Sequence, residues 1–322
     1  MTRSRLLLAA SLATISLVAA WGVIDPDGIV ASAAVVVDQY FVSRGWFVML
    51  AVSGMLILCI VLAASRYGNI RLGADDDRPE FSTPSWIAML FAAGMGVGLL
   101  FWAVAEPLTH YGFASEFMDP PIAAHQSLLA TNFHWGLHAW AIYGSTALVI
   151  AYFAFRRGTP MLVSAPVEHL FPGETWARVV GWLSDFMAIV AIAIGVGGSI
   201  AMGVFQVADG VDVLMGGDKA PVWLVAAVFA AIVAAYLPPL LVELGAGMAR
   251  LSNLAISIAI ALVVYVVIVG PTEYLMNSVV ASFGEYATTA IPRGFQTLNF
   301  FDNAILTWFK DWTLTYMVWW IA

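Results

Sequence analysis

Long apolar runs separated by short polar connectors are the feature of this 322-residue chain that most limits its fold. A helix that crosses a bilayer needs about 20 apolar residues, because the hydrocarbon core is about 30 Å thick. Hydrophobic residues make up 61% of the chain and charged residues 11%, proportions that are unusual for soluble domains. We therefore predict an all-α polytopic membrane protein, with spanning helices in the runs Leu6–Ile24, Trp46–Ser65, Ser85–Ala105, Phe133–Phe155, Leu183–Val207, Val222–Tyr236 and Leu254–Val269.

The two ends of the chain need separate interpretation. The first run, Leu6–Ile24, follows Arg3 and Arg5 as the core of a secretory signal peptide would. Such cores are about 7–15 residues long, whereas this run matches a full span, so we predict that it is retained. The last run, Trp312–Ala322, has about half the length that a span needs. We therefore expect a truncated chain, with about seven complete spans and part of an eighth.

The distribution of basic residues predicts an orientation. Cytoplasmic connectors of membrane proteins carry an excess of Lys and Arg. With the N-terminus in the cytoplasm, nine basic residues fall on the inner side (Arg3, Arg5, Arg66, Arg71, Arg78, Arg156, Arg157, Arg178, Arg250) and four on the outer side (Arg44, Lys219, Arg293, Lys310). We therefore predict a multi-pass protein of the plasma (inner) membrane with a cytoplasmic N-terminus. Because these charges form no basic stripe, nucleic acid is not expected as a partner.

Three glycines interrupt the third run. Gly94, Gly96 and Gly98 each disfavour a helix by about 1 kcal/mol relative to alanine, and their spacing makes backbone carbonyls reachable. In a membrane, a loosened backbone is tolerated where protein or a water-filled cavity covers it, and secondary transporters build substrate and ion sites from such broken helices. The alternative is that Gly94 and Gly98 form a GxxxG face for helix packing.

The fourth predicted helix carries a set of aromatic residues. At 100° per residue, Trp135, Trp140 and Tyr143 fall within an arc of about 140°. Rings along one wall suit a quaternary ammonium group, because this cation has no N–H donor and is attracted mainly by ring faces. Two further tryptophans, Trp319 and Trp320, lie in the last run. The alternative is an interfacial aromatic belt or ordinary core packing.

Other kinds of chemistry have little support in the sequence. His134 and His138 have the four-residue spacing of two metal ligands on a helix, but Trp135 replaces the Glu of the metalloprotease pattern, and no Cys, Asp or His cluster supplies a third ligand. No Gly-x-Ser-x-Gly or Walker motif occurs, and Cys59 is the single cysteine. We therefore predict no enzyme activity, no catalytic residue and no metal centre.

The order of four features resembles a known family. They are the Gly-Met-Gly-Val-Gly segment at 94–98 followed by Ala-Glu-Pro at 105–107, the set Trp135, Trp140 and Tyr143, the pair Ser252-Asn253, and the pair Trp319-Trp320. From about Trp46 to Ala322 the chain resembles the betaine/choline/carnitine transporter family. The resemblance implies a leucine-transporter-like fold, in which two inverted five-helix repeats follow two extra helices. Residues 1–84 would then hold the extra helices and a cytoplasmic connector, 85–277 the first repeat, and 278–322 a periplasmic connector and the start of a truncated second repeat.

The resemblance also implies roles for individual aromatic residues. Trp135, Trp140, Tyr143 and Trp320 would form the substrate cage, and Trp319 would lie on the exit path toward the cytoplasm. The family's tryptophan two residues before Trp319 is Met317 in this chain, so we expect the exit path to differ.

For ion coupling, the resemblance points to the glycine segment. Ala92 and Met95 match positions whose carbonyls help to bind one sodium ion in sodium-coupled members, and the three glycines would let the segment bend. A second sodium site uses two threonines, which Ile192 and Val196 replace in this chain. We therefore expect at most one coupling sodium ion, and no cofactor besides it.

Together these features predict a secondary active transporter that imports a quaternary ammonium or related onium compound of the betaine, choline or carnitine type. Sodium symport is our first expectation; an uncoupled substrate:product exchanger and a proton-coupled symporter stay open, with Glu106 as the nearest candidate for a proton carrier. A channel or a membrane sensor is the alternative from another class. The expected partners are a small onium substrate and the lipid bilayer, with a homotrimer as an open alternative.

Overall fold

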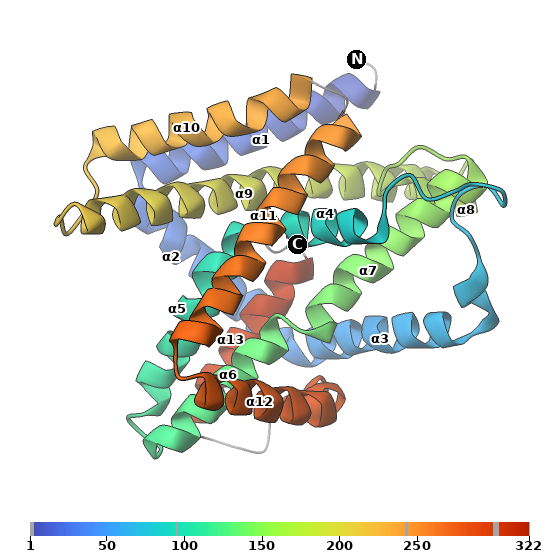
Figure 1. Ribbon diagram of the computed structural model, residues 1–322. Coiled ribbons are helices and arrows are strands. Elements are labelled where there is room, and N and C mark those ends of the chain that lie inside the picture. Colours follow the sequence, from blue (N-terminus) through green and yellow to red (C-terminus); the bar gives the residue numbers. More distant parts are fainter. Residues whose placement is uncertain (1–2, 95, 242–243, 299–302, 322) are drawn as a thin grey trace. The chain divides into compact units, whose positions relative to one another are not determined.

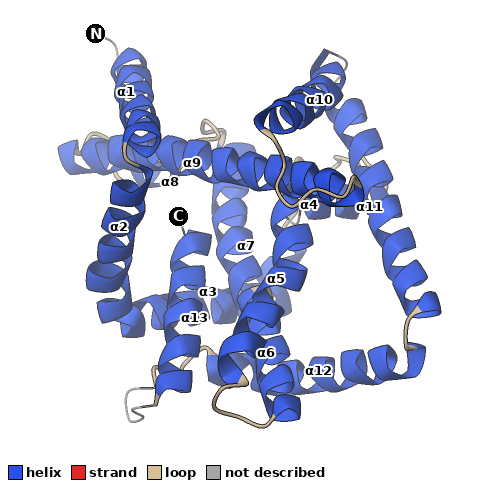
Figure 2. Cartoon of the chain, turned by 90° about the vertical axis from the view of Figure 1, so that its left-hand side faces the viewer, coloured by secondary structure: helices blue, strands red, loops and turns tan. Residues whose placement is uncertain are grey.

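The computed structural model describes residues 3–94, 96–241, 244–298 and 303–321. All regular structure in these ranges is helical, as Figure 2 shows, so the predicted all-α class is confirmed. Contacts divide the chain into two compact units. Unit 1 consists of Met1–Asp77, His110–Ile194 and Gly284–Ala322, and unit 2 consists of Arg78–Thr109 and Gly195–Phe283.

Several helices are long and apolar enough to cross a membrane, which confirms the polytopic class. In the described part of the chain five stretches meet this condition alone, and a sixth is reached if one bent helix pair counts as a single span. The five are α1 (Arg3–Ile24), Pro26–Ala64, Pro120–Arg156, α9 (Thr175–Leu214) and Gly247–Val269. Over the described residues the seven predicted runs fall on helical segments, but the third and fourth runs are each divided between two helices. The runs Leu183–Val207 and Leu254–Val269 belong to longer helices than the sequence predicts.

In unit 1, α1 is followed at once by α2 (Pro26–Val36). Asp25 caps α2, because its carboxylate accepts the Gly28 N–H at 3.0 Å, and Pro26 takes the first helical position, where its missing N–H removes no hydrogen bond. A π-helical segment, Val37–Phe41, and a 3₁₀ segment, Val42–Arg44, then lead into α3 (Gly45–Ala64).

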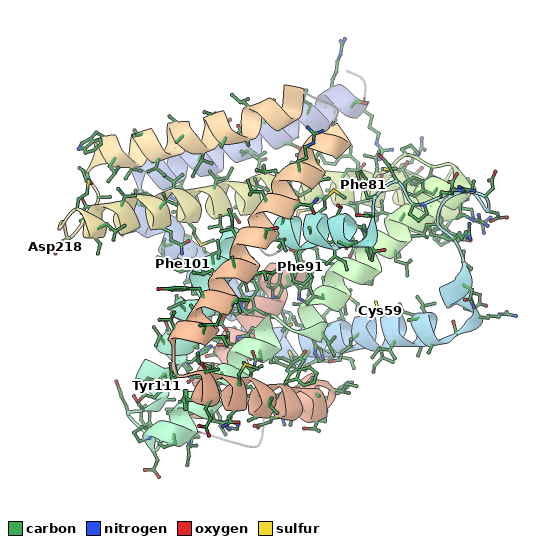
Figure 3. The ribbon with its side chains drawn as sticks, viewed as in Figure 1. Cys59, Phe81, Phe91, Phe101, Tyr111 and Asp218 are labelled. Atoms are coloured by element: carbon green, nitrogen blue, oxygen red, sulfur yellow. The ribbon has the colours of Figure 1, made fainter. Side chains whose placement is uncertain are left out.

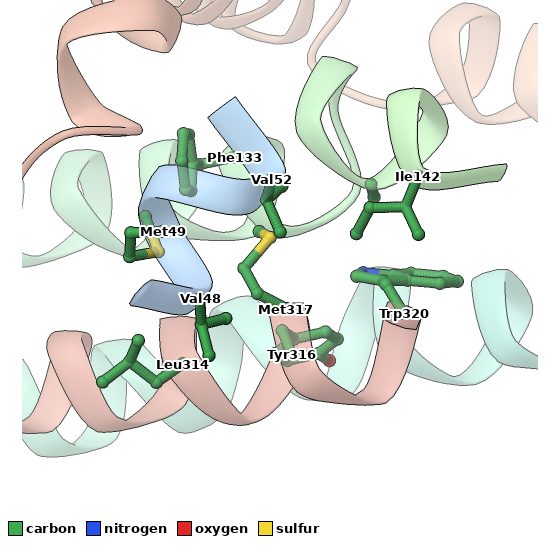
Figure 4. Close-up of a cluster of buried hydrophobic side chains, with 10 residues drawn as sticks. Val48, Met49, Val52, Phe133, Ile142, Leu314, Tyr316, Met317 and Trp320 are labelled. Carbon is green, nitrogen blue, oxygen red and sulfur yellow. The ribbon is translucent and has the colours of Figure 1, made fainter. Parts of the chain in front are cut away.

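The core of unit 1 lies where α13 (Ala304–Ile321) packs against α3, α6 (Pro120–His134) and α7 (Leu137–Ala151). Figure 4 shows Met317 reaching from α13 toward Val52 of α3, while the Trp320 ring lies beneath Ile142 of α7. Close packing of this kind is a main source of stability between membrane helices. The buried apolar side chains of the core are Val48, Met49, Val52, Phe133, Ala139, Ile142, Leu314, Tyr316, Met317 and Trp320.

The last helix begins earlier than the sequence predicts. The apolar run was expected to start after Asp311, but α13 starts at Ala304. Asn303 accounts for the difference, since its side-chain oxygen accepts the Ile305 N–H at 2.8 Å and satisfies a donor of the first turn. Polar residues such as Lys310 and Asp311 disfavour a membrane-spanning segment, but they do not prevent a helix from forming.

The polar stretch after Val269, which the prediction assigned to a periplasmic connector from residue 278 on, is also mostly helical. It forms α12 (Thr272–Arg293), whose first turn holds Glu273 and whose last turn holds Arg293. Both charges suit the helix dipole, which favours an acid near the N-terminus and a base near the C-terminus. Residues 284–293, the C-terminal half of α12, belong to unit 1.

A polar connector in unit 1 is fastened to the end of a helix. The connector comes directly after α3 and begins with a 3₁₀ turn, Arg66–Asn69. The Arg156 guanidinium, at the end of the π-helical segment after α7, donates to Asp75 Oδ1 at 2.8 Å and to the Gly73 carbonyl at 3.0 Å. This hydrogen bond and the positive charge hold the pKa of Asp75 below its usual range. The short helix α8 (Ala165–Leu170) precedes α9.

The cysteine of the chain has a simple structural place. Cys59, labelled in Figure 3, lies half-buried on α3, and its Sγ is 3.8 Å from the Ala141 carbonyl oxygen of α7. A small side chain at this point lets the two helices pack closely.

In unit 2, α11 (Leu244–Val269) crosses and contacts α4 (Thr83–Gly94), as Figure 1 shows, and it also contacts α10 (Val222–Leu241). Asn253 Nδ2 donates a hydrogen bond to Ser85 Oγ at 3.0 Å and joins α11 to α4. The third predicted span, Ser85–Ala105, is not one helix: α4 ends at Gly94, α5 (Val97–Ala114) follows, and the two are inclined by 62°. The glycines between them disfavour a continuous helix.

Candidate functional site

Three aromatic residues of unit 1 surround the ring of Trp320. We call Trp135, Trp140, Tyr143 and Trp320 the aromatic cage. The Trp320 ring centroid lies 5.1 Å from that of Trp135, 5.7 Å from that of Tyr143 and 6.3 Å from that of Trp140. The Trp140 and Tyr143 centroids are 5.9 Å apart. The structure thus groups the four residues that the sequence assigned to a cage, and their role in binding stays a prediction.

A helix break places these rings. The sequence predicted one helix over Phe133–Phe155, but α6 ends at His134 and α7 begins at Leu137. Trp135 and Gly136 lie between them, with Gly136 in an extended conformation (ψ −153°). The prediction that Trp135, Trp140 and Tyr143 lie on one face of a single helix was therefore wrong, because Trp135 does not share a helix with Trp140. The apolar run hides the break, since a single Gly is a weak signal.

The break also determines how the indoles are held. Trp140 Nε1 donates to the Trp135 carbonyl oxygen at 2.9 Å, and Trp320 Nε1 donates to the His134 carbonyl oxygen at 2.9 Å. Carbonyls at a helix C-terminus have no partner within the helix, so they are available as acceptors. An indole has one N–H donor only. These two rings therefore offer a ligand their faces and edges rather than a hydrogen-bond donor.

Burial differs among the cage residues. Trp320 is 8% exposed, Trp135 and Trp140 are half-buried, and Tyr143 is 49% exposed. Ring faces attract a cation most strongly where water is excluded. The cage is thus closed on the side of α13 and open on the side of Tyr143.

The other predicted residues of the last helix lie apart from these ring contacts. Trp319 is 56% exposed, whereas Met317 is fully buried in the core of unit 1. Met317 packs there as a core side chain (Figure 4). Position 317, where methionine replaces the family's tryptophan, thus lies in the core of unit 1.

The two histidines of the predicted pair do not share a helix, because the break lies between them. His134 and His138 are both fully buried. His134 Nε2 is 2.8 Å from Thr313 Oγ1, and the His134 ring centroid lies 5.7 Å from that of His110. His110 Nδ1 accepts a hydrogen bond from Trp308 Nε1 at 3.0 Å. Sequence reasoning missed His110, which lies 24 positions before His134 and shares no local pattern with it.

The glycine segment lies at the junction of two helices in unit 2. Ala92 belongs to α4, Gly94 ends α4, and Gly98 lies in the first turn of α5. A Cβ added at Gly96 would lie 3.3 Å from the Ala92 carbonyl oxygen, a tight contact. Met95 lies outside the described residues, so the predicted sodium site is described only in part.

The two positions at which the second sodium site would need threonines lie on one continuous helix. Ile192 and Val196 lie on α9, and their side chains are 64% and 53% exposed. A buried carboxylate, Asp185, also lies on α9 and was not among the predicted proton carriers. It is 5% exposed, and its Oδ1 accepts the Ser164 N–H at 2.9 Å. A buried acid in an otherwise apolar run was readable in the sequence. Glu106, the predicted proton-carrier candidate, is fully buried on α5.

A cavity in unit 1 is lined by none of the four cage residues. It is bounded by Trp46, Phe133, Phe309 and two basic residues, Arg293 and Lys310. Since a cation in this cavity would face two like charges, it does not suit an onium group.

Comparison with known sequences decides the family. The sequence profile of "BCCT, betaine/carnitine/choline family transporter" matches residues 6–322. This chain belongs to that family. The family description and the several span-length helices together indicate a multi-pass membrane protein of the transporter class. The recognition that the glycine and tryptophan motifs suggested is thereby confirmed.

Three relatives are similar to this chain over most of its length. The glycine betaine transporter OpuD of Bacillus subtilis is 38% identical over 94% of this chain. The betaine/ectoine transporter LcoP of Corynebacterium glutamicum and a probable glycine betaine transporter of Desulfitobacterium hafniense are 35% and 34% identical over the same share. The chain spans 59%, 48% and 60% of these three proteins.

Proposed function

We propose that this BCCT chain serves a secondary active transporter that imports a quaternary ammonium or related onium compound, with the aromatic cage as its cation site. The observation that carries the proposal is the convergence of three aromatic rings on that of Trp320, at centroid distances of 5.1 to 6.3 Å. A cation held against several ring faces gains about 2 kcal/mol or more from each good desolvated contact.

The hydrogen bonds of the cage favour a fully substituted cation. Trp140 and Trp320 direct their N–H groups to backbone carbonyls, and an indole has no acceptor, so these two rings offer an N–H-bearing ammonium no hydrogen bond. A trimethylammonium group has no N–H and loses nothing by this arrangement. The names of the relatives, which include glycine betaine and ectoine transport, support a betaine-like substrate.

For energy coupling, we propose symport with one sodium ion. A dehydrated sodium ion needs several oxygen ligands, and Ile192 and Val196 offer none from their side chains. The junction between α4 and α5 is the stronger candidate, since broken helices leave carbonyls free to turn toward an ion. Buried Glu106 keeps proton coupling as the competing hypothesis. The proposed orientation keeps the N-terminus in the cytoplasm and follows from the positive-inside rule.

Uptake by the full-length protein in proteoliposomes tests the function and the coupling together. Labelled glycine betaine is offered with a sodium gradient, a proton gradient or neither. We expect uptake against the concentration gradient with sodium alone, with a Hill coefficient for sodium near one. Uptake driven only by protons would exclude sodium coupling, and a Hill coefficient clearly above one would exclude a single site. Failure to move any trimethylammonium compound would exclude the proposed substrate class.

A further inference from the structure

The C-terminal half of α12 reaches the break between α6 and α7. Figure 2 shows this end of the helix near α6, and a contact between Glu285 and His125 of α6 joins the two helices. Tyr286 Oη accepts a hydrogen bond from the Leu137 backbone N–H at 2.5 Å. Leu137 is the first residue of α7, and the first N–H groups of a helix have no partner within it. Tyr286 therefore caps α7 from a position 149 residues away in the chain.

Gly136 makes room for this cap. It occupies the N-cap position of α7 and has no side chain that could satisfy the first turn. A Cβ at Gly136 would overlap Tyr286 Oη and Cζ and would lie 2.6 Å from the Asn132 carbonyl oxygen. Because Gly136 has no side chain, the Tyr286 phenol can approach the backbone there, and its oxygen serves as the acceptor for the Leu137 N–H.

The segment that carries Tyr286 is itself fastened to unit 1. The Glu285 carboxylate contacts Nε2 of His125 on α6. Nine residues later, Ser53 Oγ of α3 donates to the Gly294 carbonyl oxygen at 2.8 Å. Contacts on both sides of Tyr286 hold the end of α12 in place, so the phenol is not a freely moving side chain.

Three consecutive parts of the break then have fixed partners. The His134 carbonyl holds Trp320, the Trp135 carbonyl holds Trp140, and the Leu137 N–H is held by Tyr286. The first two contacts orient the indoles of the aromatic cage. The third contact restrains the next peptide unit along the chain, since only Gly136 separates Trp135 from Leu137.

We propose that Tyr286 is a positioning residue of the onium site, which fixes the α6–α7 break and through it the orientation of Trp140 and Trp320. The inference rests on the proposed function. Tyr286 acts through the backbone rather than on the substrate. Burial raises the pKa of the Tyr286 phenol, so the group stays neutral and the cap persists throughout the physiological pH range.

The test compares Tyr286→Phe, which removes one oxygen and keeps the ring, with Tyr274→Phe. Tyr274 lies on the same helix and is 68% exposed, which makes it a matched control. Uptake of glycine betaine and of N,N-dimethylglycine is measured with the full-length protein in proteoliposomes. In Tyr286→Phe we expect KM for glycine betaine to rise about three- to tenfold, the range that one lost hydrogen bond supports. We also expect the preference for the trimethyl over the dimethyl compound to fall, while Tyr274→Phe matches the wild type.

A readout that does not depend on transport completes the test. Amide hydrogen exchange of the peptide that contains Leu137 should become faster in Tyr286→Phe than in the wild type and in Tyr274→Phe. A merely structural loss would lower the amount of active protein and leave KM and the substrate preference unchanged. Unchanged KM and preference in Tyr286→Phe would overturn the inference, as would unchanged exchange. If the wild type moves neither compound although exchange responds as expected, the proposed function fails and the cap itself stands.

Discussion

The indole N–H of Trp320 donates to the backbone carbonyl of His134 at 2.9 Å, which joins the last turn of α13 to the end of α6. The two residues are 186 positions apart. This hydrogen bond sets the angle at which the Trp320 ring meets Trp135, with the two planes at 86°. An edge-to-face pair of this kind is a favoured aromatic arrangement. The orientation of the central cage ring therefore depends on a backbone group that the helix break leaves available.

Substitutions at Trp320 separate the ring from its N–H group. Trp320→Phe keeps an aromatic face but cannot donate to His134, so we expect KM for a trimethylammonium substrate to rise a few-fold. Trp320→Ala, like Trp140→Ala, removes a whole ring face and should raise KM tenfold or more. Uptake kinetics of the full-length protein measure both effects.

Trp319 provides the control for these variants. It is the neighbouring tryptophan on α13, but it is 56% exposed where Trp320 is 8% exposed. We expect Trp319→Phe to leave KM close to the wild-type value, and an exit-path role would show as a change in maximal rate. Equal increases in KM for Trp319→Phe and Trp320→Phe would contradict the assignment of Trp320 to the cage.

The sequence was sufficient for the helices but not for their breaks. Apolar runs report length and burial, which is why the spans were found and why the all-α class was correct. The break at Trp135–Gly136 lies in a continuous apolar stretch, and what stabilises it is the Tyr286 cap on Leu137. A contact between residues 149 positions apart leaves no periodic mark in either segment. By contrast, three glycines within five residues were enough to predict the junction of α4 and α5.

The aromatic cage was predictable in composition but not in geometry. Spacing alone put Trp135, Trp140 and Tyr143 on one wall of a helix, and that geometry was wrong because the helix ends before Trp135. Trp320 was added through the family resemblance, since nothing in the residue pattern links α13 to α6. The structure supplies the hydrogen bonds that connect them.

Gly96→Ala tests the junction of α4 and α5. A methyl group at this position would lie 3.3 Å from the Ala92 carbonyl oxygen and would disfavour the bend. We expect transport per folded molecule to fall several-fold with little change in expression. Gly54→Ala on α3 is the control, because a Cβ there meets nothing within 4 Å. A matching loss in both variants, or a loss of expression alone in Gly96→Ala, would favour simple helix packing at the glycines.

The hydrogen bond between Asn253 and Ser85 should stabilise unit 2. Asn253 Nδ2 lies 3.0 Å from Ser85 Oγ and joins α11 to α4. Ser85→Ala removes the acceptor and should lower the free energy of unfolding by about 0.5–1.5 kcal/mol. Thermal unfolding in detergent measures this change. Ser257→Ala on α11 is the control, because its exposed hydroxyl donates to the Asn253 carbonyl of its own helix, and it should have a smaller effect. The reverse order would show that the Asn253 contact with Ser85 contributes little.

The contact between Asp75 and Arg156 should make the connector after α3 sensitive to acid. Because the guanidinium lowers the pKa of Asp75, the contact is fully present above about pH 4, the usual range for Asp, and is lost as the pH falls through the lower value in the folded protein. A nitroxide label on Ala74→Cys, with Cys59 replaced, reports the motion of the connector. We expect the label to become mobile only below about pH 4, and also in high salt, which screens exposed ion pairs. In Asp75→Asn the label should be mobile at every pH, whereas Asp76→Asn should keep the wild-type profile. A label that becomes mobile well above pH 4 in the wild type would show that another group holds the connector.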